Sequence, residues 1–114
     1  MDLLFNFAFA VKRFEVYLVA LDPTVGREMQ KVRPAVIVSP DVMNRLVGTV
    51  IVAPMTTTMR SFPFRVACRF QGKAGQIALD HLRGVDKVRL IKPLGRVSPP
   101  VQKAILSTLA QIFS

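Results

Sequence analysis

The sequence is nearly devoid of the residues that cross-link small folds through disulfides or metals. Among its 114 residues there is one cysteine, Cys68, and one histidine, His81. A lone cysteine excludes an intrachain disulfide, and this pair falls short of any recognisable zinc-ligand set. The scattered carboxylates show no metal-ligand spacing. We therefore expect stability from packing alone, a mechanism without metal or cofactor, and a reducing compartment such as the cytoplasm.

Acidic residues are also scarce. Seven Asp and Glu stand against 16 Lys and Arg, which leaves a formal net charge of +9. Because 51% of the residues are hydrophobic and only 20% are charged, the chain has the composition of a folded domain rather than of a disordered one. The charge favours polyanionic partners, among which nucleic acids and anionic membranes are not distinguished by charge alone.

No apolar run is long enough to span a bilayer, and the run Leu3–Val11 has about half the necessary length. Asp2 precedes it and Lys12 follows it, which reverses the charge order of a secretory signal. Three interpretations stay open for residues 1–11: an added edge strand or arm, a disordered or partner-binding tail, or residues upstream of a true start at Val11. The length of 114 residues predicts a single domain with residues 1–11 as an extension.

Short runs rich in β-branched and aromatic residues, bounded by Gly and Pro, dominate the rest of the sequence and predict strands. In one of them apolar residues alternate with arginines, the period of a half-buried strand. A single helical turn fits 86–91, a loop or one turn fits 40–48, and an exposed basic loop fits 24–32. The predicted strands are Phe14–Leu21, Pro34–Ser39, Thr49–Pro54, the alternating Phe64–Phe70, Gln76–Leu82 and Leu94–Val97.

A helix is predicted at the end of the chain. Ser98 is suited to the N-cap position, and Pro99 to the first helical position, where its missing N–H costs nothing. An apolar stripe that should pack on the sheet follows at helical spacing: Val101, Ala104, Ile105, Leu109, Ile112 and Phe113. Short strands followed by one helix predict an α+β fold, a small antiparallel barrel.

Read in order, the segments VYLVALDPTVGRE, RPAVIVS, TVIVAPMTT, LDHLRGVDKVRL and LGRV resemble the MazF/PemK family of mRNA interferases. The resemblance covers about residues 14–97. It implies an SH3-like barrel with a C-terminal helix that forms a homodimer and is neutralised by a cognate acidic antitoxin protein. It also implies that the protein is the toxin of a type II toxin–antitoxin system, which cleaves single-stranded RNA without metal and so inhibits translation and growth. In the family, positions matching Arg33 and Thr56 act in cleavage.

Metal-free RNA cleavage needs a base for the 2'-hydroxyl, stabilisation of the phosphorane and an acid for the leaving oxygen. Arg33 offers a planar, permanently charged fork for phosphate oxygens, so we assign it transition-state stabilisation. The alternative is an arginine paired with a carboxylate. Thr56 follows a predicted strand, where its hydroxyl can position a phosphate; the alternative for 56–58 is turn capping.

The general base is less certain. Glu28 matches a family glutamate and is the first candidate, while its alternative role is to pair with neighbouring cations. His81 has suitable chemistry near neutral pH, although a histidine beside Asp80 is more often structural. PemK-like members carry an arginine two residues before that aspartate and a histidine in the first loop. Here Ala78 and Arg27 stand in those places, so the PemK-like acid–base set is incomplete.

The predicted RNA contacts comprise cations, a hydroxyl, an aromatic ring and the Asp80–His81 pair. Phe62 offers a stacking face for an unpaired base or belongs to the core, and Asp80 binds RNA or supports the site. The cations are alternatively solvated surface. The full set is Arg27, Lys31, Thr57, Arg60, Phe62, Asp80, His81 and Arg83.

Two other functions compete with the nuclease. The same barrel occurs in CcdB-type toxins, which bind DNA gyrase and end in a Trp-Gly-Ile tail; this chain has no tryptophan and ends in Gln111-Ile112-Phe113-Ser114. An inactive family member that binds RNA or antitoxin is the second rival, against which the presence of Arg33 and Thr56 argues.

Overall fold

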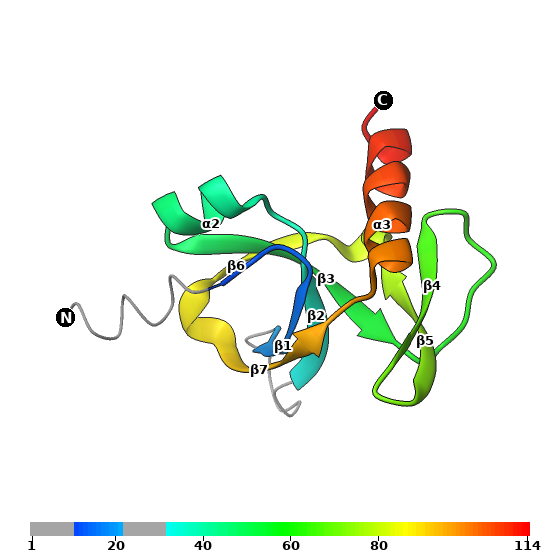
Figure 1. The fold of residues 1–114 in the computed structure, drawn as a ribbon, viewed down its shortest axis with the longest axis horizontal. Helices are drawn as coiled ribbons and strands as arrows, with labels where there is room; N and C mark the ends of the chain where they lie inside the picture. Colours follow the sequence, from blue (N-terminus) through cyan, green and yellow to red (C-terminus); the bar gives the residue numbers. More distant parts are fainter. Residues whose placement is uncertain (1–10, 22–31) are drawn as a thin grey trace, which may run out of the picture.

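The computed structural model describes residues 11–21 and 32–114 (Figure 1). Over these residues an antiparallel sheet precedes a long C-terminal helix, and a short helix lies between two of the strands. The elements are β1 (Glu15–Ala20), β2 (Val32–Ile37), α2 (Asp41–Leu46), β3 (Thr49–Thr56), β4 (Arg65–Phe70), β5 (Lys73–Ala78), the 3₁₀ turn η1 (Leu79–His81), β6 (Arg83–Asp86), the 3₁₀ turn η2 (Lys87–Arg89), β7 (Leu90–Arg96) and α3 (Pro99–Ile112).

The strand order is β4-β5-β3-β2-β1-β7, and β6 pairs with β3 beside this path. The eight-residue β3 pairs with β2 and β6 over its first part, and only its end, Met55 and Thr56, pairs with β5. Strand β3 thus leaves one part of the sheet and joins the other at Thr56. The sheet curls into a half-barrel, and the predicted antiparallel barrel with a C-terminal helix is confirmed (Figure 1).

The second half of β2 and the middle of β3 are buried on both faces, which explains why their sequences are continuously apolar there instead of alternating. In β2, Val36 faces one hydrophobic cluster while Ala35 and Ile37 face another. In β3, Ala53 faces the first cluster and Val52 faces the second. Each fully buried Val or Ile contributes about 1.5–3 kcal/mol to folding, so these two strands anchor the fold.

Helix α3 covers the first of these clusters with the early part of its apolar stripe. Ile105 is buried, and Val101, Ala104 and Leu109 pack around it. The prediction was wrong for the end of the stripe, since Ile112 is 39% and Phe113 73% exposed. At about 1.5 Å per residue the helix is about 21 Å long and projects beyond the sheet (Figure 1).

The predicted N-cap position of α3 is confirmed. Ser98 is the N-cap residue and Pro99 the first helical residue, but the Ser98 hydroxyl makes no capping hydrogen bond. Its carbonyl instead accepts the N–H of Gln102, and the Gln102 amide donates to the Val97 carbonyl at 2.8 Å.

The region predicted as one strand, 76–82, differs most from expectation. Strand β5 begins earlier, at Lys73, because Gln71 and Gly72 both have positive φ and form a two-residue hairpin turn. It also ends earlier, at Ala78. The apolar pattern that suggested a longer strand continues into η1, where Leu79 is buried in the core although it is no longer in a strand. The following β6, which is short and rich in polar residues, carried no strand signal and was missed.

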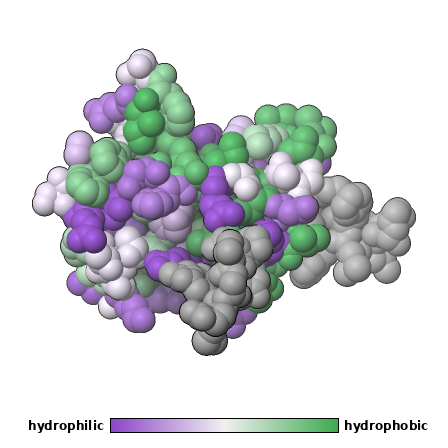
Figure 2. All heavy atoms as spheres, turned by 180° about the vertical axis from the view of Figure 1, so that it is seen from behind, coloured by the Kyte–Doolittle hydropathy of each residue, from purple (hydrophilic) through white to green (hydrophobic). Residues whose placement is uncertain are grey.

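The loop or single turn expected at 40–48 is the short helix α2, which rests on a buried polar cluster. The Ser39 hydroxyl donates to the Asn44 side chain at 2.6 Å, and the Asn44 amide donates back to the Ser39 carbonyl. Lys87, from the predicted turn now seen as η2, donates to the Asn44 carbonyl, and burial lowers the pKa of its ammonium group. The outer surface of α2 is hydrophobic, through Val42 and Leu46 (Figure 2).

Candidate active site

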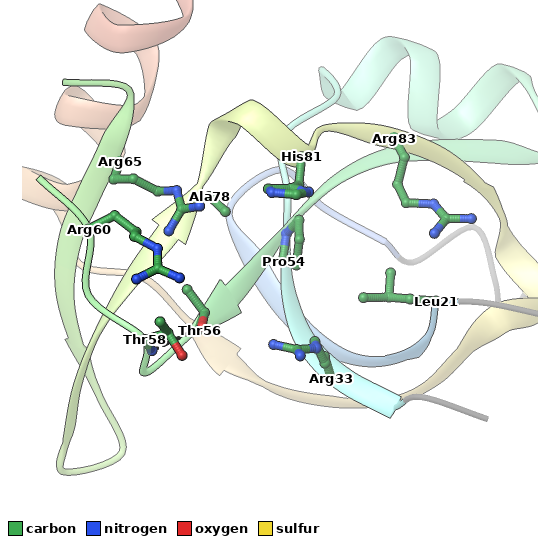
Figure 3. A pocket seen from close by; sticks show the side chains of 10 residues that line it. All are labelled: Leu21, Arg33, Pro54, Thr56, Thr58, Arg60, Arg65, Ala78, His81 and Arg83. Carbon is green, nitrogen blue, oxygen red and sulfur yellow. Dashed lines mark hydrogen bonds between the residues drawn. The ribbon is translucent and has the colours of Figure 1, made fainter. Parts of the chain in front are cut away.

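A pocket of about 410 Å³ opens where β3 passes from β2 to β5 (Figure 3). Its described lining contains four arginines and one histidine, and no carboxylate. A concave surface lined in this way attracts anions. The lining residues are Leu21, Arg33, Pro54, Thr56, Thr58, Arg60, Arg65, Ala78, His81 and Arg83.

Arg33 projects from β2, where it lies opposite Val19 of β1 (Figure 3). It is half-buried, and it lines both this pocket and an adjoining one of about 430 Å³. No carboxylate within residues 11–21 and 32–114 pairs with it, so the alternative of a structural ion pair finds no partner there. The guanidinium is positioned to bind a group that enters either pocket.

Thr56 ends β3 and also lines both pockets. Its hydroxyl oxygen accepts a hydrogen bond from the N–H of Thr58 at 3.0 Å, so it does cap the turn that follows. The hydroxyl proton is still available to a ligand. Thr57 lines only the adjoining pocket, whereas Thr58, which was not among the predicted residues, lines both.

The wall opposite Arg33 contains an arginine that the site prediction missed. Arg65 starts β4, and Asp80 in η1 holds its guanidinium with two hydrogen bonds: Nε to Oδ1 at 2.7 Å and Nη2 to Oδ2 at 3.1 Å. Their side chains are only 8% and 23% exposed. The bonds from Arg65 lower the pKa of the Asp80 carboxyl group. The alternation of arginines along 64–70 was the only sequence signal for this residue.

Phe62 lies over this ion pair. Its ring centroid is 5.4 Å from the Arg65 guanidinium carbon and 5.1 Å from the ring of Phe64. Phe62 is 44% exposed, so the core interpretation was wrong and an accessible ring face remains. Asp80 faces Arg65, which favours the supporting role over direct RNA contact.

Gln76 fixes the loop that carries Arg60 and Phe62. Its side-chain oxygen accepts the Arg60 N–H at 3.0 Å, and its amide donates to the Arg60 carbonyl at 2.9 Å. Gln76 is also the partner of Thr56 in the β3–β5 ladder. Beside it, a Cβ on Gly75 would lie 2.7 Å from the Thr56 carbonyl oxygen, so only glycine permits this approach of the two strands.

The remaining predicted residues fall into two groups. His81 is 64% exposed, lines the pocket and lies 3.4 Å from Asp80, and Arg83 reaches the pocket from β6. Glu28, Arg27 and Lys31 lie outside the described residues.

Over the described part of the chain, no group of three or more metal-ligating side chains is placed to hold an ion. No helix in this part is long and apolar enough to cross a membrane.

Residues 12–113 match the family described as PemK-like, MazF-like toxin of type II toxin–antitoxin system. The chain belongs to this family. It is 34% identical over 110 residues to a protein named endoribonuclease PemK from Escherichia coli, covering 91% of this chain and 83% of that one. It is also 34% identical over 86 residues to endoribonuclease EndoA of Bacillus subtilis, covering 70% and 74% of the two chains.

Solved structures agree with this family. A mycobacterial endoribonuclease in complex with its cognate antitoxin superimposes with a TM-score of 0.76 at 29% identity, covering 90% of this chain and 94% of that one. A MazE–MazF structure from Deinococcus radiodurans gives a TM-score of 0.78 at 24% identity, covering 90% and 95%, which shows the shared fold. The predicted family is thereby confirmed.

Proposed function

We propose that this protein is a toxin that cleaves single-stranded RNA, chiefly mRNA, at selected sequences and thereby inhibits translation and growth. The observation that carries the proposal is the cationic pocket in which Arg33 and Thr56 converge from adjacent strands. Relatives that share a third of its sequence bear the name endoribonuclease. The positive charge of the chain suits a polyanionic substrate.

The proposed reaction is attack of a ribose 2'-oxygen on the adjacent phosphorus. The 2'-oxygen–phosphorus bond forms, the bond to the 5'-oxygen breaks, and the products are a 2',3'-cyclic phosphate and a 5'-hydroxyl. Arg33 stabilises the negative charge of the phosphorane, because its permanently charged fork matches two phosphate oxygens. Thr56 positions the same phosphate through its hydroxyl proton, since its oxygen already accepts from Thr58.

Proton transfer needs a further group, for which Glu28 and His81 are the candidates. His81 lines the pocket and is accessible to substrate, and imidazoles exchange protons near neutral pH. Glu28 rests on the family resemblance. Variants Glu28→Gln and His81→Gln, compared over a range of pH, would identify the base by the loss of one limb of the pH–rate profile.

We also propose that the protein acts as a homodimer in the cytoplasm and that an acidic antitoxin neutralises it. A net charge of +9 favours an acidic partner, and one similar structure is an endoribonuclease bound to its cognate antitoxin. Size-exclusion chromatography with light scattering tests the dimer. Co-expression with the product of a neighbouring small acidic reading frame tests the antitoxin.

The deciding experiment incubates the purified protein with naked RNA in EDTA. Cleavage in EDTA is expected, and sequencing the new 5' ends reads the recognised motif. Intact RNA together with inhibition of DNA gyrase would support a CcdB-type poison instead. Intact RNA that is nevertheless bound would indicate an inactive RNA-binding member of the family.

A further inference from the structure

Arg65 occupies an unusual place in the pocket. It lies directly opposite Ala78 in the β4–β5 ladder, and both residues line the pocket. The small side chain of Ala78 leaves room in this wall, and the Arg65 guanidinium lies beside it (Figure 3). The guanidinium of Arg65, a β4 residue, therefore lies at the place in the pocket wall where the side chain of Ala78, a β5 residue, is too small to reach into the pocket.

The guanidinium of Arg65 is held on two sides. Asp80 accepts hydrogen bonds from Nε and Nη2, and the guanidinium carbon lies over the Phe62 ring, 5.4 Å from its centroid. The remaining nitrogen, Nη1, has no hydrogen-bond partner among the described residues, nor is it buried without one. This end of the fork is thus oriented in advance and retains its donors for a ligand in the pocket.

Preorientation changes what an arginine contributes to binding. A free arginine loses conformational entropy when a ligand immobilises it, and Arg65 has already lost most of this freedom on folding. Arg60, by contrast, is exposed and has no ion pair with a described residue. Asp80 offsets part of the charge of Arg65. The pair therefore contributes mainly oriented hydrogen-bond donors to ligand binding, while Arg33 and Arg60 contribute net positive charge.

We propose that Arg65 is a second RNA-phosphate ligand of the pocket, beside Arg33, and that Asp80 is a positioning residue that acts through Arg65 without touching RNA. This inference rests on the proposed function. It assigns the Asp80–Arg65 pair to the orientation of the RNA backbone, and Phe62 to holding the guanidinium in place through their cation–π contact.

The test compares Arg65→Ala with Arg69→Ala. Arg69 lies on the same face of the same strand, carries the same charge and lines neither pocket, so it is a matched control. The probe is an RNA of the determined motif with a 2'-deoxy scissile nucleotide, which binds but is not cut. We expect Arg65→Ala to weaken its binding about 10–100-fold and Arg69→Ala less than about threefold.

A double-mutant cycle tests the role of Asp80. Asp80→Asn removes the charge but keeps the volume, and we expect it to weaken probe binding about three- to tenfold and to raise KM more than it lowers kcat. In the Arg65→Ala background the same change should have no further effect. An undiminished effect in that background would show that Asp80 acts on RNA directly and would overturn its positioning role.

Folding controls keep the outcomes separate. If Arg65→Ala is destabilised, Arg65→Gln preserves the packed stem and is used instead, with circular dichroism to confirm the fold. Equal binding of the probe by the Arg65 and Arg69 variants, with wild-type cleavage intact, would overturn the inference and leave the proposed function standing. Failure of the wild-type protein to cleave or bind RNA would contradict the proposed function itself.

Discussion

The two walls of the pocket are built differently. Arg33 and Thr56 form one wall from adjacent strands of the continuous sheet. Within residues 11–21 and 32–114, Thr56 has a side-chain hydrogen bond, to its own turn, and Arg33 has none. The other wall contains Arg65, which is held by two residues outside the pocket lining, Asp80 and Phe62. The first wall has side chains free to act on a ligand, whereas the second has side chains that are already ordered. Reactivity is thus expected from one wall and substrate alignment from the other.

The largest effect is expected in the first wall. Arg33→Ala should lower RNA cleavage about 10²–10³-fold, because it removes the proposed electrostatic stabilisation of the phosphorane. The change should leave the thermal midpoint Tm nearly unaltered, since Arg33 has no ion pair among the described residues. Initial rates on the motif RNA and thermal melts measure both. A folded variant that cleaves at the wild-type rate would remove Arg33 from the mechanism.

The junction between the walls should be almost as sensitive. Gly75→Ala places a Cβ 2.7 Å from the Thr56 carbonyl oxygen and must push β5 away from β3. We expect a fall in Tm of roughly 5–15 °C and about 10–100-fold slower cleavage. Gly48→Ala is the control, since nothing lies within 4 Å of its Cβ. Unchanged cleavage and Tm for Gly75→Ala would show that the strands adjust without cost.

A smaller effect is expected where the second wall holds its loop. Gln76→Ala removes both hydrogen bonds to the backbone of Arg60 and should raise KM about three- to tenfold while changing kcat less. Gln102→Ala, which removes an amide hydrogen bond at the start of α3, serves as control. If the two variants have the same KM on the motif RNA, the loop does not need this support.

The smallest effect is in the pH dependence of stability. The pKa of Asp80 is lowered in the folded protein, so its contribution is complete above the unfolded value of about 3.9 and is lost as the pH falls through the folded value. The Tm of Asp80→Asn should therefore lie about 3–6 °C below that of the wild type at pH 7. This gap should shrink as the pH falls below about 4. The exposed Asp86→Asn should show no such gap, and a gap independent of pH would exclude the ion pair as its cause.

The sequence by itself determined what depends on short segments. The β-branched runs predicted most strands, the Ser98-Pro99 pair located the start of α3, and short motifs around Arg33 and Thr56 indicated the family and the first wall. Each of these features is contained within a few neighbouring residues, so it can be recognised before the register of any strand is known.

Only the tertiary structure decided the second wall. Arg65 and Asp80 are 15 residues apart, and Gln76 and Arg60 are 16 apart. Their contacts depend on the register of β4 and β5, where a shift of one residue would turn Arg65 to the opposite face of the sheet. The hairpin turn at Gln71 and Gly72 sets that register. The sequence shows Arg65 only as one residue of an alternating strand. Its place in the pocket depends on long-range strand pairing, which leaves no local pattern in the sequence.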